Sequence, residues 1–178
     1  MNKLEKNSIG ILGGSFDPPH KGHLKISLYI LKKLKIKKLY WVITKKNPFK
    51  KEPFFSLSER LKKCKKITKK SKKIKVQFLE KLTKSNKMID NLKYIIKKNK
   101  KSKFYLIIGS DNLTSFHKWK YWKNILRLSE LVIFSRKGYN KEAKNSFLMQ
   151  YLNKKEFIYI KNCKIDISSS QLRKFYLR

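Results

Sequence analysis

Residues 9–23 read IGILGGSFDPPHKGH, and the interpretation of the whole chain starts from this stretch. Its first four residues are mostly apolar and form a short run that is typical of a buried strand. Gly13 and Gly14 then allow a turn in which a ligand can approach the backbone amides. His20 and His23 follow, three residues apart, at the amino end of a helical pattern, where anions bind favourably. The stretch therefore predicts a strand, a phosphate-binding turn and a helix.

The same alternation of apolar runs and helical patterns continues along the chain. Further strands are expected at residues 39–43, 74–79, 104–108, 131–134 and 157–160. Helices are expected from near His20, from Ser56 to about Lys70, at 88–98, 111–128 and 143–152, and in a short closing segment that carries Arg173. Strands that alternate with helical crossovers predict one doubly wound α/β domain over residues 1–178, a mostly parallel sheet with helices on both faces.

The composition favours a folded domain with an unusual charge. The chain has 178 residues, of which 40% are hydrophobic, and this excludes a disordered chain. The net charge is +36, and only five of the 47 basic residues are arginines. A polyanionic partner is one explanation; the other is a lysine bias spread over solvated helix faces. The scatter of lysines from Lys3 to Lys174 favours the second, so no specific nucleic acid is expected, although nonspecific polyanion binding follows from either.

The cysteines and the apolar runs bear on the compartment. Cys64 and Cys163 lie far apart and in no CxxC pair, so they suggest neither a disulfide framework nor a zinc site. No apolar stretch approaches the roughly 18 residues of a membrane span. We therefore expect a cytoplasmic protein with reduced thiols and no membrane association.

Three polar segments follow predicted strands and should meet at one edge of the sheet. They are residues 13–14, the region of Thr44, and residues 109–111. In doubly wound sheets the ligand crevice lies beyond the carboxyl ends of the strands. The glycines of the first segment match neither the dinucleotide fingerprint GxGxxG nor the Walker A loop. The crevice therefore calls for a different phosphate-binding motif.

The motif GGSFDPPHKGH resembles the signature of the nucleotidyltransferases that carry an HxGH sequence, and its longer form resembles their nicotinate mononucleotide adenylyltransferase branch. Further segments are similar to motifs of that branch: NPFK at 47–50, GSDNL at 109–113, FHKW at 116–119, and ISSSQLR at 167–173, in which Ser170 replaces the usual threonine. The resemblance runs from residue 9 to residue 173. It implies a Rossmann-like domain whose closing segment is part of the active site.

The resemblance also implies a reaction and a site for ATP. In this branch the 5′-phosphate of nicotinate mononucleotide attacks the α-phosphate of ATP, giving deamido-NAD and pyrophosphate, with Mg²⁺ on the phosphates and no protein metal site. The implied catalytic residues are His20 and His23. The other residues implied in ATP binding are Gly13, Gly14, Ser15, Phe16, Ser169, Ser170 and Arg173.

The mononucleotide site is implied in the same way. Trp119 would stack on the pyridine ring and Asp111 would accept hydrogen bonds from ribose hydroxyls. Lys50 would bind the mononucleotide phosphate, and its rivals in the same loop are Lys45, Lys46 and Lys51. Trp122 is expected to pack in the core. The loops at residues 47–55 and 111–121 should border the crevice.

One segment departs from the branch. Where the branch often has Thr-x-x-Thr-Leu, residues 88–92 read MIDNL. Asn91 can still donate a hydrogen bond to the nicotinate carboxylate, but the preference for nicotinate over nicotinamide is left open. Two alternatives also remain: another HxGH adenylyltransferase, acting on phosphopantetheine or nicotinamide mononucleotide, and a basic nucleic-acid-binding protein on the same fold.

Overall fold

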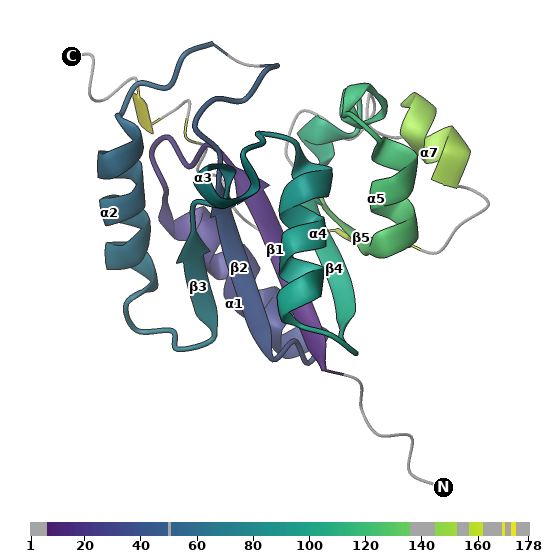
Figure 1. Ribbon diagram of the computed structural model, residues 1–178, viewed down its shortest axis with the longest axis horizontal. Coiled ribbons are helices and arrows are strands. Elements are labelled where there is room, and N and C mark those ends of the chain that lie inside the picture. Colours follow the sequence, from purple (N-terminus) through teal and green to yellow (C-terminus); the bar gives the residue numbers. More distant parts are fainter. Residues whose placement is uncertain are drawn as a thin grey trace, which may run out of the picture.

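The sheet is the frame of the molecule. The computed structural model describes residues 7–49, 51–135, 145–152, 157–161, 169, 172 and 173. Within this part of the chain one parallel sheet has the strand order β3-β2-β1-β4-β5-β6 (Figure 1). Its strands are β1 (Ser8–Gly14), β2 (Lys38–Ile43), β3 (Ile74–Gln77), β4 (Lys103–Gly109), β5 (Glu130–Phe134) and β6 (Phe157–Ile160).

The strand order places a crevice beside β1. From β1 the chain winds outward to β2 and β3, then crosses back to β4 on the other side of β1 and winds outward again. The connections that leave the carboxyl ends of β1 and β4 therefore diverge, which is where doubly wound sheets bind ligands. The doubly wound α/β fold predicted from the sequence is confirmed.

Helices cover both faces of this sheet. They are α1 (Lys21–Lys33), α2 (Leu57–Thr68), α3 (Glu80–Thr83), α4 (Met88–Lys98), α5 (Trp122–Leu128) and α7 (Phe147–Leu152), with short 3-10 turns η1 (Ser110–Asn112) and η2 (Phe116–Lys118). α1 and α2 pack into one hydrophobic cluster, while α4, α5 and α7 pack into a second on the other face. None of the helices described is long and apolar enough to cross a membrane.

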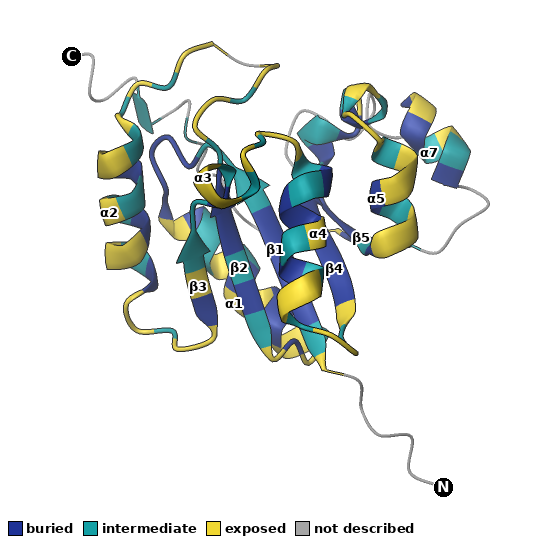
Figure 2. Ribbon diagram, viewed as in Figure 1, coloured by how far each residue is buried: buried dark blue, intermediate teal, exposed yellow. Residues whose placement is uncertain are grey.

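Successive strand residues feed the two clusters in turn. In β1, Ile11 belongs to the α4 side and Leu12 to the α1 side, and Leu106 and Ile107 of β4 divide in the same way. The central strands are therefore buried on both faces, as Figure 2 shows. This burial explains why the strands appear in the sequence as continuous apolar runs, the pattern of parallel sheets.

The helix α2 begins with a capping box formed by Ser56 and Glu59. The Ser56 hydroxyl accepts a hydrogen bond from the Glu59 amide at 3.3 Å, and the Glu59 carboxylate accepts one from the Ser56 amide at 2.9 Å. The Ser56 hydroxyl also donates to the Glu59 carboxylate at 2.7 Å, and this hydrogen bond, together with the one from the Ser56 amide, lowers the pKa of Glu59. The box fixes the residue at which α2 leaves the long loop of residues 44–55.

Two stretches differ from the predicted pattern. Residues 111–128 are not one helix: η1 and η2 come first, Trp119 is extended, and Tyr121 has a left-handed φ of 58°, so α5 starts only at Trp122. The third strand ends at Gln77, and the unpredicted helix α3 follows it. Of the helix expected at 143–152, residues 143 and 144 lie outside the described residues, and α7 begins at Phe147.

Cys64 is expected to be chemically inert in the folded protein. Its side chain is fully buried, and burial raises the pKa of the thiol to about 12. Because only the thiolate reacts, a Cys163→Ser variant, which leaves Cys64 as its one thiol, should not be alkylated by iodoacetamide at pH 8. Mass spectrometry checks this, with the same variant in urea as the positive control. Modification of the native variant as fast as of the unfolded one would contradict the prediction. Cys163 itself lies outside the described residues.

Candidate active site

The two histidines hold their rings through the start of α1. His20 is the N-cap residue, and its Nδ1 accepts a hydrogen bond from the Gly22 amide at 3.1 Å. The Nδ1 of His23 accepts a hydrogen bond from the His20 amide at 3.2 Å. The ring centroids lie 3.8 Å apart. A neutral imidazole that accepts at Nδ1 carries its proton on Nε2, so we assign Nε2 as the donor atom of both rings.

Aromatic side chains pack against the His23 ring and restrain its orientation. Phe16 lies 4.9 Å from His23 and stacks on Trp41 at 4.8 Å. The indole of Trp41 donates to the Ser27 hydroxyl, which in turn donates to the His23 carbonyl. Phe16 has a left-handed φ of 48°, an unfavourable conformation for a bulky side chain that this packing stabilises. The Phe16 side chain is therefore a support for the turn, and only its backbone can face a ligand.

Asp17 joins three segments below the turn. Its side chain is buried, with 5% exposed. The carboxylate accepts hydrogen bonds from the amides of Phe54 and Phe55, at 2.8 and 2.9 Å. Arg173 contacts the same carboxylate at 3.4 Å and donates to the Asp17 carbonyl at 2.6 Å. The turn after β1 is thereby bound to the end of the 44–55 loop and to the closing segment of the chain.

Two residues of the closing segment contact the turn after β1. The Ser169 hydroxyl donates to the Pro18 carbonyl at 3.0 Å, and Arg173 lies against Asp17. Ser169 and Arg173 thus contact turn residues that precede them by 151 and 156 positions in the sequence. Ser170, the third member of the predicted set, lies outside the described residues.

The 44–55 loop is bound at its first residues too. The Glu80 carboxylate accepts hydrogen bonds from the Thr44 hydroxyl at 2.6 Å and from the Lys45 amide at 3.0 Å. Lys46 forms an exposed ion pair with Glu52 across the loop. Lys50 lies outside the described residues, so its predicted phosphate contact stays a prediction, as do those of its rivals.

Asn91 is buried, and its predicted contact with the mononucleotide stays a prediction. Its side chain is buried, with 4% exposed, and its amide oxygen accepts a hydrogen bond from the Thr83 hydroxyl at 3.2 Å. Met88, the other residue of the departing motif, places its terminal methyl in the space that a side chain on Gly13 would need. The absence of a side chain at Gly13, near the end of β1, therefore allows Met88 of α4 to pack directly against this strand.

The aromatic segment follows the carboxyl end of β4. Asp111 lies in η1, partly exposed, and accepts a hydrogen bond from the Asn112 side chain at 3.2 Å. Trp119 is partly exposed and rests on the fully buried Phe116, with ring centroids 4.9 Å apart. Trp122 packs edge-on against other rings, those of Phe147 and Tyr151. The expected packing role of Trp122 is therefore confirmed, while ligand contacts of Asp111 and Trp119 stay predictions.

The comparisons with known proteins agree with this geometry. The model of the cytidylyltransferase-like family matches residues 11–175. The chain belongs to this family.

Relatives within the family carry a more specific name. A protein of Pelagibacter ubique (strain HTCC1062) named "probable nicotinate-nucleotide adenylyltransferase" is 47% identical over 170 residues, which cover 96% of this chain and 94% of the relative. A protein of Ruegeria sp. (strain TM1040) with the same name is 33% identical over 131 residues, covering 74% and 69%. The resemblance that the sequence motifs predicted is thereby confirmed.

A solved structure shows that the fold is shared. The Plasmodium falciparum nicotinic acid mononucleotide adenylyltransferase complexed with NaAD superposes with a TM-score of 0.76, over 95% of this chain and 83% of that one. Its sequence identity to the chain is 23%. The six-stranded sheet with helices on both faces is therefore the family fold.

Two residues that hold the segments of this candidate site together were not predicted from the sequence. They are Arg60 and Glu80. Arg60 is 1% exposed and donates hydrogen bonds to the carbonyl of Ser15, in the turn after β1, and to that of Phe55, in the 44–55 loop. A signal existed in the sequence: Arg60 occupies the buried stripe of α2 with Cys64 and Thr68, four and eight residues later. A lone arginine in a lysine-rich helix, on its apolar face, indicates a guanidinium with a specific task.

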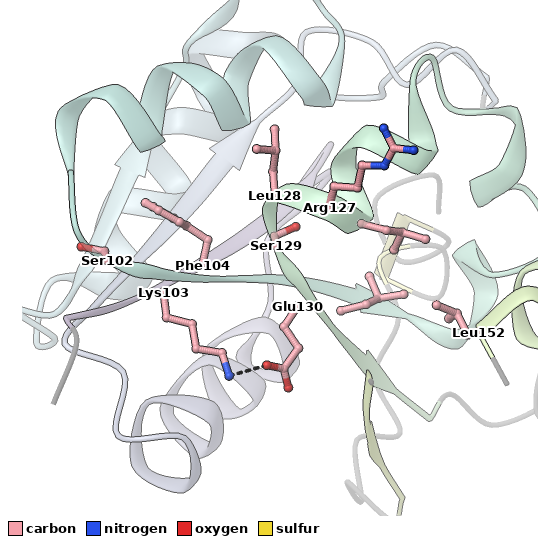
Figure 3. Close-up of a pocket in the computed structure, with 10 residues that line it drawn as sticks. Ser102, Lys103, Phe104, Arg127, Leu128, Ser129, Glu130 and Leu152 are labelled. Carbon is pink, nitrogen blue, oxygen red and sulfur yellow. Dashed lines mark ion pairs between the residues drawn. The ribbon is translucent and has the colours of Figure 1, made fainter. Parts of the chain in front are cut away.

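A cavity of about 450 Å³ lies away from this site (Figure 3). Lys103, at the amino end of β4, and Glu130, at the amino end of β5, form an ion pair at its edge. The hydrogen bond to Glu130 raises the pKa of Lys103. The turn that carries the two histidines (residues 15–23, the histidine turn) follows the carboxyl end of β1. The cavity therefore opens at the opposite edge of the parallel sheet, and none of the predicted site residues line it.

Proposed function

We propose that the chain is a nicotinate mononucleotide adenylyltransferase of NAD biosynthesis. The carrying observation is that Ser169 and Arg173 of the closing segment contact Pro18 and Asp17, in the same turn that leads into His20 and His23 at the amino end of α1. This arrangement supports binding of a triphosphate, and the name of the relatives that are 47% and 33% identical supports the acceptor.

In the proposed reaction the chain's residues bind and orient both substrates. A phosphate oxygen of nicotinate mononucleotide forms a bond to the α-phosphorus of ATP, and the bond from that phosphorus to the bridging oxygen breaks, so that pyrophosphate leaves. No protein nucleophile is needed for a direct in-line transfer. The Nε2–H groups of His20 and His23 donate to the phosphates, where negative charge grows in the transition state.

The other proposed contacts follow the same division. Backbone amides at Gly13, Gly14, Ser15 and Phe16 and the start of α1 bind ATP, with Ser169, Ser170 and Arg173 on its outer phosphates. Mg²⁺ enters as part of the substrate, MgATP; among the described residues no three metal-ligating side chains group together. Lys50, Asn91, Asp111 and Trp119 are proposed for the mononucleotide.

The test is product formation from purified protein with MgATP and one of three acceptors. Nicotinate mononucleotide, nicotinamide mononucleotide and phosphopantetheine are supplied separately, and both pyrophosphate and the dinucleotide are measured. The proposal expects the highest kcat/KM with nicotinate mononucleotide. Pyrophosphate from phosphopantetheine alone would assign another acceptor, and no release with any acceptor would refute the enzyme. Nonspecific binding of polyanions, expected from the charge of +36, stays a prediction.

A further inference from the structure

We propose that Arg60, together with Glu80, is a positioning residue that fixes the 44–55 loop relative to the histidine turn, and thereby aligns the acceptor phosphate with ATP. This inference rests on the proposed function, in which the turn binds ATP and the loop borders the mononucleotide. Neither residue belongs to the predicted substrate contacts. Arg60 acts through backbone carbonyls, and Glu80 acts through the Thr44 hydroxyl and the Lys45 amide.

Arg60 donates to four carbonyl oxygens in three separate segments. Its Nη1 donates to Ser15 of the histidine turn at 2.7 Å and to Thr44 at the end of β2 at 2.8 Å. Its Nη2 donates to Lys45 at 2.8 Å, and its Nε to Phe55, just before α2, at 3.0 Å. One side chain therefore contacts the turn and both ends of the loop.

The chemistry of the guanidinium suits this task and that of an ammonium does not. A guanidinium is planar and holds five N–H groups in a fixed fork, whereas a lysine has all of its donors on one atom. Burial lowers the pKa of Arg60, and the carboxylates of Asp17 and Glu80 partly offset that effect. The group remains charged at neutral pH, so its hydrogen bonds are charge-assisted and short.

Glu80 and Asp17 restrain the same loop ends from other elements. Glu80, at the start of α3, accepts from the Thr44 hydroxyl and the Lys45 amide, while Arg60 holds the carbonyls of these two residues. Asp17 holds the amides that flank the far end of the loop. Three of the candidate phosphate-binding lysines, Lys46, Lys50 and Lys51, thus lie in the sequence between the two restrained ends of the loop.

The consequence concerns alignment more than affinity for ATP. In-line transfer requires the attacking oxygen close to the α-phosphorus and opposite the leaving group, and a displacement of 1 Å can lower the rate about 10²-fold. A shift of the loop ends relative to Ser15 would displace the acceptor and leave the ATP contacts of the turn in place. Loss of the hydrogen bonds that Arg60 and Glu80 make to the loop ends should therefore reduce turnover with the mononucleotide far more than binding of ATP.

The experiment compares Arg60→Lys with Thr68→Val in the full chain. Thr68 is a matched control, since it is buried on the same face of α2 and donates only to backbone carbonyls of its own helix. We measure Tm, the Kd of a non-hydrolysable ATP analogue, and kcat and KM for nicotinate mononucleotide, all well below either Tm. Arg60→Lys should lower kcat/KM for the mononucleotide by about 10²-fold, with a change in analogue Kd below about threefold; Thr68→Val should change neither.

Glu80→Ala keeps the test decisive if Arg60→Lys does not fold. This change removes the carboxylate that accepts from the Thr44 hydroxyl and the Lys45 amide. It should lower kcat/KM for the mononucleotide by about tenfold, again without weakening the binding of the ATP analogue. Normal kcat/KM in folded Arg60→Lys, or in Glu80→Ala when it alone folds, would overturn the inference. Equal losses in analogue affinity and in turnover would overturn it too if they follow the loss in Tm, because a general loss of structure would then explain both. A wild-type protein that makes no dinucleotide would instead refute the proposed function.

Discussion

Replacement of His23 by asparagine is expected to lower kcat by about 10²- to 10³-fold, the usual effect of removing one donor from a phosphoryl-transfer or oxyanion site. An asparagine oxygen can occupy the place of Nδ1 and still accept the hydrogen bond from the His20 amide, so the start of α1 stays capped. The Nε2–H donor is lost. Steady-state kinetics with MgATP and nicotinate mononucleotide, with Tm measured alongside, separates the two effects.

His23→Gln is the matched control for this change. A glutamine amide can reach the place of Nε2 and donate there, while the cap at Nδ1 is lost. It should therefore retain more activity than His23→Asn and melt at a lower temperature. If His23→Asn turns over near the wild-type rate, or if the two variants rank in the opposite order, the donor role assigned to His23 is wrong.

Asp17→Ala is expected to have the largest effect on stability, a loss of about 2–5 kcal/mol in the free energy of unfolding. The buried carboxylate accepts from the amides of Phe54 and Phe55 and contacts Arg173, and alanine would remove these interactions while the Asp17 carbonyl still accepts from Arg173. Urea denaturation followed by fluorescence measures the loss.

The control for Asp17 is Glu52→Ala, which removes a carboxylate from the 44–55 loop that lies in solvent, paired with Lys46. Exposed ion pairs contribute little, so this variant should lose less than about 1 kcal/mol. Similar losses in both variants would show that the burial of Asp17 does not set the size of the effect.

Local signals in the sequence were enough for the sheet and for the turn. The apolar runs of the strands reflect burial on both faces, and the capping box at Ser56 is a short-range contact that four residues specify by themselves. The histidine turn was predictable for the same reason, because His20 and His23 bond to backbone groups within three residues. Its association with Ser169 and Arg173 came from the family motifs and not from any local pattern.

The features that were missed depend on contacts between distant residues. Residues 111–128 have helical periodicity, yet the fully buried Phe116 and the left-handed Tyr121 divide them into three pieces. Arg60 was one basic residue among 47 until the fold brought Ser15, Thr44 and Phe55 around its guanidinium. The hydrogen bond from Thr83 to the Asn91 oxygen, eight positions apart, was not predicted either, while the expected contact of Asn91 with the ligand stays a prediction.

The contacts of Pro18 with Ser169 and of Asp17 with Arg173 also determine when the protein becomes active during its synthesis. The partners lie 151 and 156 residues apart in the sequence. At about 5–20 residues per second, a ribosome needs roughly 8–30 s to add that length after the histidine turn has been made. The nascent chain can fold β1, α1 and β2 early, yet its proposed phosphate site stays incomplete until residues 169–173 have been added. Full activity should arise only once residues 169–173 have left the ribosome tunnel.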